Sequence, residues 1–237
     1  MERIVIADCR SDDKTIYSLE KIGLTVIPTK LLANLYDGIA SHADMQIHYL
    51  GNNRFICAPE AYLHYKKWLP VEFDIIKGSA ALDSTYPQDI AYNTASFGNF
   101  VICNTGSTAI EILTEYQSMS QTILNVNQGY SKCNICIVNN NSIITSDEGI
   151  ARTALKENIN TLKINAGYIK LRNMNYGFIG GATGLIEKNI LAVNGSINTH
   201  PDGDVIKEFC KKQDVELYEL KEGILEDIGS IISNLQV

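Results

Sequence analysis

The sequence has no excess of positive charge and no long apolar run, and these two absences exclude several classes of protein. The chain has 20 Lys and Arg residues against 27 Asp and Glu residues, which gives a net charge of −7. Binding to the phosphate backbone of DNA or RNA needs a broad basic face, which this balance disfavours. No apolar run approaches the roughly 20 residues that cross a bilayer, and Ile4 to Ala7 is too short for the core of a secretory signal. We therefore expect no nucleic acid partner, no membrane span and no signal.

Metal-binding spacings are also scarce. The six cysteines lie mostly in apolar segments such as Phe55 to Cys57, where thiols pack as small hydrophobic groups in a reducing compartment. One Cys-x-x-Cys pair exists, Cys133 and Cys136, but no second pair accompanies it, and the four histidines form no HxxxH or HExxH pattern. The sequence predicts a cytoplasmic protein without a metal site.

What the sequence does contain is enough apolar residues for a sizeable core. Of its 237 residues, 45% are hydrophobic, and no linker, low-complexity tract or block of like charges divides the chain. We expect a single domain over residues 1–237.

A short β-rich segment recurs along the chain, with starts about 40 to 55 residues apart, a spacing typical of propellers and solenoids. Each copy follows a polar stretch and ends in a polar or glycine-containing turn. The five copies are Leu24 to Pro28, Phe73 to Gly78, Thr122 to Val126, Thr161 to Asn165 and Val215 to Leu220.

Pairs of apolar runs joined by Asn- or Gly-containing turns recur with the same period and predict β-hairpins. The pairs are 46–50 with 54–58, 90–95 with 100–103, 135–138 with 142–145 and 177–185 with 190–193. A helix start follows each hairpin, for example Thr108-x-x-Glu111, which has the pattern of a capping box. The repeating unit is therefore hairpin, helix, strand. A fifth unit is divided between the two ends of the chain. Its strand over Arg3 to Ala7 and a helix lie at the N-terminal end, and its last strand and a terminal helix over Ile224 to Leu235 lie at the other end. This division predicts a closed ring whose termini meet.

Five such units resemble the pentein fold of guanidine-modifying enzymes, a five-bladed pseudo-symmetric α/β propeller with its active site in a central channel. Ser41 to Gln46 contains His42 and Asp44 and is similar to the His-x-Asp signature of that family, and Lys132-Cys133-Asn134 is similar to its cysteine segment. Three further sequence segments resemble those of an uncharacterised bacterial family assigned to this fold. They are Gly129 to Cys133, Ile144 to Asp147 and Tyr176 to Ala182.

The resemblance implies a cysteine-dependent enzyme, similar to a deiminase, dihydrolase or amidinotransferase, that acts on a small cationic guanidino or amidine compound without metal or cofactor. By residue, it implies that Cys133 attacks the guanidinium carbon, His42 transfers protons and Asp44 holds the cation. Enzymes of this fold carry further acids, for which Asp89 and Asp8 are the candidates, and Lys132 adjoins the nucleophile.

Alignment of the hairpins on their Asn turns, Asn53 with Asn141, sets Met45 opposite Cys133. Both motifs then lie in loops before the first strand of their units, and five-fold symmetry points both loops at the same axis. Lys132 and a protonated His42 are expected to lower the pKa of the Cys133 thiol.

Three other readings stay open. A catalytically inert binding protein that resembles the ribosome anti-association factor, itself a pentein of about this length, fits a five-unit ring equally well. Cys133 and Cys136 would form a redox pair only if their sulfurs lay within bridging distance. Cys9, beside Asp8 and Arg10, is the fallback nucleophile.

The glycines from Gly177 to Gly184 lack the spacing of a phosphate-binding loop and predict close backbone packing at the centre of the ring.

Overall fold

Every sheet of the structure consists of an antiparallel pair of strands and a third strand that runs parallel to the second. The structure is a computed structural model that describes residues 2–235, and it contains five such three-stranded sheets. In order of first, second and third strand, the sheets are β3 (Ile47–Gly51), β4 (Arg54–Cys57) and β5 (Asp74–Lys77); β6 (Ala95–Phe97), β7 (Phe100–Cys103) and β8 (Thr122–Asn125); β9 (Ile135–Asn139), β10 (Ser142–Thr145) and β11 (Asn160–Lys163); β12 (Thr183–Glu187), β13 (Ile190–Val193) and β14 (Glu216–Glu219); and β15 (Ile232–Ser233), β1 (Ile4–Ala7) and β2 (Thr25–Pro28).

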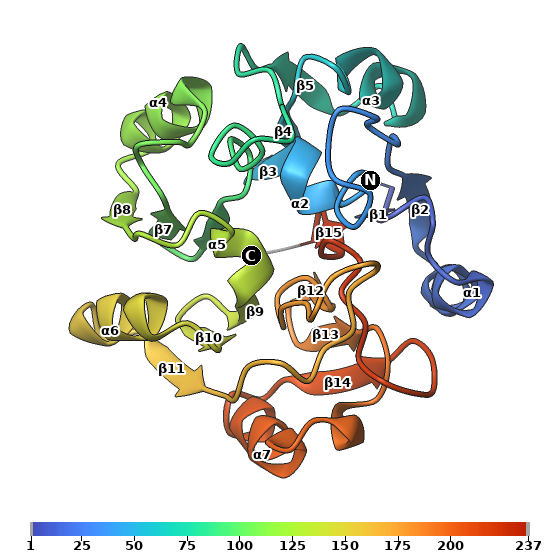
Figure 1. Ribbon diagram of the computed structural model, residues 1–237, viewed down its shortest axis with the longest axis vertical. Coiled ribbons are helices and arrows are strands. Elements are labelled where there is room, and N and C mark those ends of the chain that lie inside the picture. The colour runs from blue at the N-terminus through green and yellow to red at the C-terminus, as the bar shows by residue number, and fades with distance from the viewer. Residues whose placement is uncertain (1, 236–237) are drawn as a thin grey trace.

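One longer helix connects the second strand of each sheet to the third. These helices are α1 (Asp13–Lys21), α3 (Tyr62–Trp68), α4 (Ile110–Ser118), α6 (Glu148–Lys156) and α7 (Gly203–Lys212), the last preceded by the short 3₁₀ helix η1 (Ile197–Thr199). Figure 1 shows them at the periphery of the molecule, with the sheets arranged around a common centre. Two four-residue helices, α2 (Ala43–Gln46) and α5 (Ser131–Asn134), lie near that centre. In the residues that the structure describes, no helix is both long and apolar enough to cross a bilayer.

Apolar side chains of neighbouring sheets form the core. One buried cluster combines Ile4 and Ile6 of β1 with Phe55 of β4, and another combines Ile102 of β7 with Ile143 of β10. Alternate residues of a strand point to opposite faces, so a second strand that is buried on both faces joins two such clusters. The sheets therefore support one another rather than each forming a separate core.

The five recurring strands and the hairpin–helix–strand order are confirmed by these pairings. All five predicted copies are the third, parallel strands β2, β5, β8, β11 and β14. The sheet β15-β1-β2 joins the two ends of the chain, and the Asn234 side chain donates a hydrogen bond of 3.0 Å to the Glu2 carbonyl.

The predicted helix over Ile224 to Leu235 is wrong, and so is the way in which the fifth unit was divided. This segment is an extended turn that ends in β15, the first strand of its sheet, whereas the last strand of that sheet is β2. Its apolar spacing suits a helix, but Gly229 and Ser230 have positive φ values of 71° and 69°. Two successive left-handed residues end a right-handed helix.

Two smaller predictions also differ from the structure. The capping box does not form, because Ala109 is the N-cap of α4, Thr108 donates to the Asn104 carbonyl and Glu111 accepts from the Ser79 amide. The predicted strand 90–95 is a turn up to residue 94, and β6 begins at Ala95. This turn carries Asn93, a residue of the site.

Candidate active site

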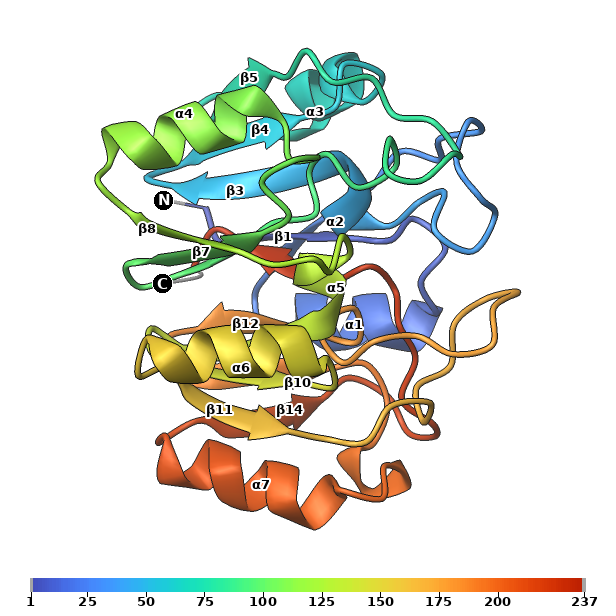
Figure 2. The same cartoon turned by 60° about the vertical axis from the view of Figure 1, so that its left-hand side comes forward.

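The chain segments that precede the first strands of the five sheets meet at the centre of the molecule. These central segments are residues 41–46, 89–94, 128–134, 177–182 and 225–231, which precede β3, β6, β9, β12 and β15. Figure 2 shows that long loops, among them those around residues 30–42 and 165–178, project on one side of the sheets. Residues of both loops, among them Tyr36 and Met174, line a cavity that also contains residues of the central segments.

A closed cycle of hydrogen bonds links the central segments. The bonds run from the Gly181 amide to the Cys133 carbonyl (3.0 Å), from the Ser230 amide to the Gly181 carbonyl (2.9 Å), from the Asp44 amide to the Gly229 carbonyl (3.0 Å), from Asn93 Nδ2 to the Asp44 carbonyl (3.2 Å) and from the Cys133 amide to Asn93 Oδ1 (3.3 Å). Each segment is held by its neighbours on both sides. Side chains on these segments are thus positioned by the whole ring.

Cys133 lies in this cycle, in α5, with 3% of its surface exposed. Its thiol donates to Asp44 Oδ2 at 3.2 Å and accepts from Asn93 Nδ2 at 3.1 Å. Asp44 Oδ2 also accepts from Ser230 Oγ at 2.5 Å, and Ser230 Oγ accepts from Lys132 Nζ at 3.1 Å. A chain of polar groups therefore runs from a buried ammonium to the thiol.

His42 lies between two carboxylates. Its Nε2 is 4.0 Å from Asp8 Oδ2 and its Nδ1 is 3.8 Å from Asp227 Oδ1. Nδ1 is buried and has no hydrogen-bond partner among the described residues. Gly229 packs so closely on the ring that a Cβ there would lie 2.2 Å from His42 Cβ. The imidazole is thus held in place by packing rather than by hydrogen bonds at Nδ1.

A cavity of about 290 Å³ contains three of these groups together. His42, Cys133 and Asp227 line it, and the rest of its wall is mainly aromatic and aliphatic. Asp227 Oδ1 accepts from the Gly229 amide and Oδ2 from the Phe178 amide, both at 2.9 Å. A nucleophile, an acid–base group and a carboxylate therefore face the same space.

Burial and negative charge control the Cys133 thiol. Burial, followed by the charges of Asp44 and Asp227, raises its pKa well above the ordinary value, although the Asn93 hydrogen bond opposes this. Burial also raises the pKa of Asp227, and the nearby His42 opposes that shift. The predicted depression of the Cys133 pKa is therefore wrong, because burial and the charges of Asp44 and Asp227 raise this pKa instead.

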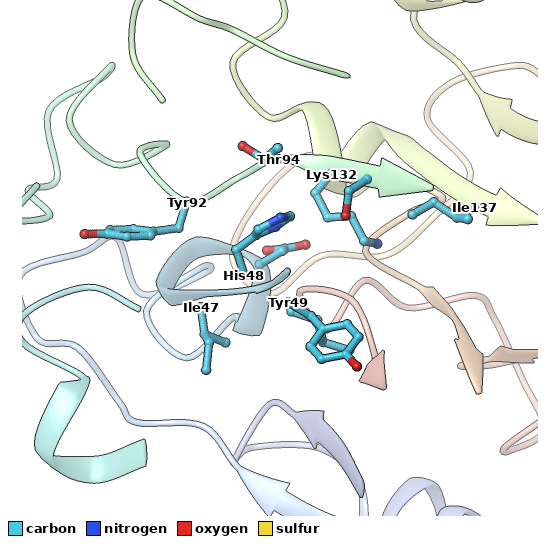
Figure 3. Close-up of a pocket in the computed structure, with 10 residues that line it drawn as sticks. Ile47, His48, Tyr49, Tyr92, Thr94, Lys132 and Ile137 are labelled. Atoms are coloured by element: carbon cyan, nitrogen blue, oxygen red, sulfur yellow. The ribbon is translucent and has the colours of Figure 1, made fainter. Parts of the chain in front are cut away.

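Lys132 faces away from the larger cavity. Burial lowers the pKa of its ammonium, which the charge of Asp44 opposes. Lys132, Asp44 and His48 line a second, very small cavity of about 10 Å³, and Figure 3 shows Lys132 and His48 beside each other there. Burial, together with the charge of Lys132, lowers the pKa of His48 to about 3, so this histidine is neutral at pH 7.

The two further candidate acids lie outside the larger cavity. Asp89 is fully buried and accepts a short hydrogen bond from the hydroxyl of Tyr130, which does line the cavity. Burial raises the pKa of Asp89, and the Tyr130 bond opposes the shift. Asp8 accepts a hydrogen bond from the Arg10 amide at 2.7 Å, and its Oδ2 lies 4.0 Å from Nε2 of His42. These acids therefore contact residues of the site rather than the cavity.

The glycine-rich segment packs against the site, as expected. A Cβ on Gly180 would lie 2.6 Å from the Cys133 carbonyl, and one on Gly181 would lie 2.0 Å from Asp227 Oδ1. Glycine is required here because no side chain fits between the segments. This segment is a close contact at the centre of the molecule, and it brings Cys133 and Asp227 to the same cavity.

Sequence reasoning missed Asp227, Ser230 and Asn93. The first two lie in the segment that was expected to be helical, and Asn93 lies in the turn that was expected to be a strand. The signal that could have found them is positional, because all three occupy the stretch before the first strand of a unit, as His42 and Cys133 do.

All six cysteines are free. Cys9 is exposed and does not line the cavity, while Cys136 and Cys133 belong to different buried clusters. Within residues 2–235, no group of three or more His, Cys, Asp or Glu side chains is arranged to hold a metal ion.

A family model described as a family of unknown function (DUF6873) matches residues 6–232 of the chain. No match was found among curated proteins.

Solved structures with a similar fold include three guanidino-modifying enzymes. The amidinotransferase SxtG from Microseira wollei is 12% identical, with a TM-score of 0.58 over 92% of this chain and 88% of that one. A mutant of DDAH from Pseudomonas aeruginosa, complexed with citrulline, is 7% identical, with a TM-score of 0.61 over 98% and 96%. The agmatine deiminase of C. jejuni is 9% identical, with a TM-score of 0.53 over 93% and 88%. At these identities the likeness shows the fold alone, and that fold is the pentein fold.

Proposed function

The chain belongs to the family of unknown function DUF6873 and has the pentein fold, and from this premise we propose that it is a cysteine-dependent enzyme acting on a small cationic guanidino or amidine compound. The observation that carries the proposal is the cavity shared by Cys133, His42 and Asp227. A nucleophile, a proton-transfer group and an anion for the substrate are the parts that attack on a guanidinium carbon requires.

The reaction proceeds through a covalent intermediate. The Cys133 sulfur bonds to the guanidinium carbon, and the thiol proton passes to Asp44, which already accepts a hydrogen bond from it. The carbon–nitrogen bond to the departing amine then breaks as His42 gives that nitrogen a proton. Water, or an acceptor amine in a transfer reaction, next attacks the carbon and loses a proton to His42. The carbon–sulfur bond breaks, and the thiol regains its proton from Asp44.

Substrate binding itself activates the nucleophile. Without a ligand, burial and two carboxylates keep the Cys133 thiol neutral. A guanidinium beside Asp227 adds a positive charge next to the sulfur and offsets both anions, which lowers the pKa of the thiol. The neutral resting thiol is less open to unrelated electrophiles, and the thiolate forms where the substrate is bound.

Asp44 has a different role from the one implied by the family resemblance. Its Oδ2 is occupied by Ser230 and Cys133, and it lines the smaller cavity rather than the larger one. We propose that Asp227 pairs with the substrate cation and that Asp44 accepts the proton of the Cys133 thiol. Lys132 acts through Ser230 as a positioning residue, and Asp89 acts through Tyr130.

We propose that residues 1–237 are a single domain and that pseudo-five-fold symmetry relates its units, which is supported by the same strand order in all five sheets. A cytoplasmic location is supported by five buried free thiols, since a reducing compartment preserves them.

Selective alkylation tests the proposal. 2-Chloroacetamidine carries a planar cation and a leaving group, so a brief exposure near neutral pH followed by peptide mass mapping is expected to find label on Cys133 before the other five cysteines. Asp227→Asn and His42→Ala are expected to slow this labelling by about tenfold or more, because each removes a group that faces the cation. Asp204→Asn, which changes an exposed carboxylate, is the matched control and is expected to have no effect.

Label on Cys9, label spread evenly over several cysteines, or labelling of Cys133 that ignores both substitutions would refute the proposal. Each of these results would make an inert binding protein of the same fold the better account. Thermal unfolding of every variant distinguishes a local effect from loss of the fold.

A further inference from the structure

The wall of the cavity above Cys133, His42 and Asp227 is apolar and aromatic. Apart from Asn175, this part of the lining consists of apolar and aromatic side chains, among them Tyr130, Leu171 and Phe178. Met174, Tyr176 and Tyr36 are 54%, 44% and 50% exposed, which sets them at the mouth of the cavity. A volume of about 290 Å³ is at the lower end for small-molecule pockets, so the occupant is small.

Aromatic rings form a continuous row along this wall. Tyr130 stacks on Phe178 with ring centroids 6.4 Å apart and an interplanar angle of 26°, and Tyr176 meets Phe178 edge to face at 6.0 Å. Tyr86 extends the row beyond Tyr130 at 6.1 Å. Because buried Asp89 accepts a hydrogen bond from the Tyr130 hydroxyl, the Tyr130 ring is held in place before any ligand binds. Such a surface stacks on a flat apolar group or a cation.

Among the residues that the structure describes, the cavity offers an anionic group no permanently charged partner, and His42 is already engaged in proton transfer in the proposed mechanism. Across residues 2–235, the lining contains no Lys or Arg, and Asp227 is its only carboxylate. Arg10 bonds Ser41 and Asp37, and Lys132 bonds Ser230 behind the site. A substrate carboxylate, such as that of an amino acid, would lose its hydration here without gaining a permanent counter-charge, which disfavours its binding.

We propose that the substrate carries one cationic guanidine or amidine head and a short uncharged tail that is apolar or aromatic, without a carboxylate. The head lies against Asp227 and Cys133, and the tail stacks on Tyr130 and Phe178. This inference rests on the proposed function, and it adds that these two rings determine specificity. Arg172 is exposed on the loop that carries Leu171 and Met174, and it is the group through which a carboxylate would have to bind if the inference were wrong.

Binding to the Cys133→Ala protein, which cannot form the covalent bond, tests the inference by calorimetry. The probes are phenethylguanidine, n-butylguanidine, 4-guanidinobutanoate and phenethylurea. Phenethylguanidine is expected to bind about tenfold or more tighter than 4-guanidinobutanoate, with n-butylguanidine between them. In the same background, Phe178→Ala is expected to weaken phenethylguanidine by about tenfold and n-butylguanidine by much less, because only the aryl tail stacks. Tyr17→Ala, which removes an exposed aromatic ring outside the lining, is the control.

Three results would overturn the inference. They are tighter binding of 4-guanidinobutanoate that Arg172→Gln abolishes, equal effects of Phe178→Ala on both alkyl and aryl probes, and no saturable binding of either uncharged-tail guanidine to the folded protein. Failure of the proposed function looks different, since phenethylurea would then bind as tightly as phenethylguanidine and 2-chloroacetamidine would not select Cys133. Selective labelling of Cys133 together with tighter binding of 4-guanidinobutanoate would refute the inference that the substrate tail is uncharged, and it would leave the proposed enzyme function standing.

Discussion

At the scale of single residues, the state of the Cys133 thiol depends on Asp44. The carboxylate lies 3.2 Å from the sulfur. Its charge is the second largest cause, after burial, of the raised pKa of the thiol. Asp44→Asn removes this negative charge and lowers that pKa. A neutral reagent brings no cation to the site, so it reacts with the fraction of Cys133 that has lost its proton to solvent rather than to Asp44. We expect Cys133 in this variant to react about three- to tenfold faster with the neutral reagent 2-chloroacetamide near pH 7.5, because the thiolate fraction rises tenfold for each unit that the pKa falls. Measured rate constants that are unchanged or slower would contradict this electrostatic account, with Asp204→Asn as the control.

Asn93 has the opposite effect on the same thiol. Its Nδ2 donates to the sulfur at 3.1 Å, which lowers the Cys133 pKa, and its Oδ1 holds the amides of Lys132 and Cys133. Asn93→Ala is expected to move the pH profile of Cys133 alkylation to higher pH and to destabilise the fold by about 1–3 kcal/mol, because buried donors lose their acceptor. Thr94→Val is the matched control, since the Thr94 hydroxyl has no partner in the described structure. A profile that stays in place would restrict Asn93 to a structural role.

The sequence allowed the positions of His42, Asp44 and Cys133 to be predicted, because hairpin alignment brings two pre-strand loops to one axis. It did not allow their electrostatics to be predicted. The charge on a thiol depends on burial and on groups distant in the chain, here Asp44, which is 89 residues away. Asp227 was missed because an apolar spacing typical of a helix hid a turn.

At the scale of elements, third strands and hairpins were predictable because their alternating patterns and turn residues are local. The helices α2 and α5 were not, since four residues are too few to show a helical period. The C-terminal turn was mispredicted for the related reason that buried residues on both sides of an irregular segment mimic the apolar face of a helix.

Two isoleucines of the segment that leads into β15 test whether it forms a turn and a strand rather than a helix. Ile231 is fully buried and Ile224 is 62% exposed. In the turn-and-strand arrangement, Ile231→Ala is expected to lower the free energy of unfolding by about 2–5 kcal/mol, whereas Ile224→Ala is expected to change it by about 0.5 kcal/mol or less. Denaturant unfolding measures both. Equal costs would contradict the burial that this arrangement gives the two isoleucines.

Removal of residues 224–237 is a harsher change at the same place. It is expected to destabilise the protein severely, because β1 loses its antiparallel neighbour and the site loses Asp227 and Ser230. Thermal unfolding close to that of the full chain would contradict the role of β15 in closing the fold.

At the scale of the whole molecule, buried thiols predict a loss of stability at high pH. Burial raises the pKa of Cys57 and Cys210 to about 12 and that of Cys136 to about 11. In the unfolded chain these thiols ionise near pH 8.5. Between these values the native state binds more protons than the unfolded state, so the free energy of unfolding falls as the pH rises. We expect the melting temperature to fall from about pH 8.5 upward, and more steeply than in Cys210→Ala, measured by calorimetry under reducing conditions. A flat profile, or the same slope in both proteins, would show that the buried thiols do not control this dependence.

In the proposed mechanism, a cation bound in the cavity activates an otherwise neutral Cys133. The ratio of Cys133 alkylation rates for 2-chloroacetamidine and 2-chloroacetamide measures this activation, since the two reagents have the same shape and leaving group and differ in charge. The same ratio for glutathione gives the intrinsic difference between the reagents. We expect the ratio at Cys133 to exceed the glutathione ratio by about a hundredfold or more and to fall toward it in Asp227→Asn. A ratio at Cys133 equal to that of glutathione would show that a bound cation does not activate this thiol.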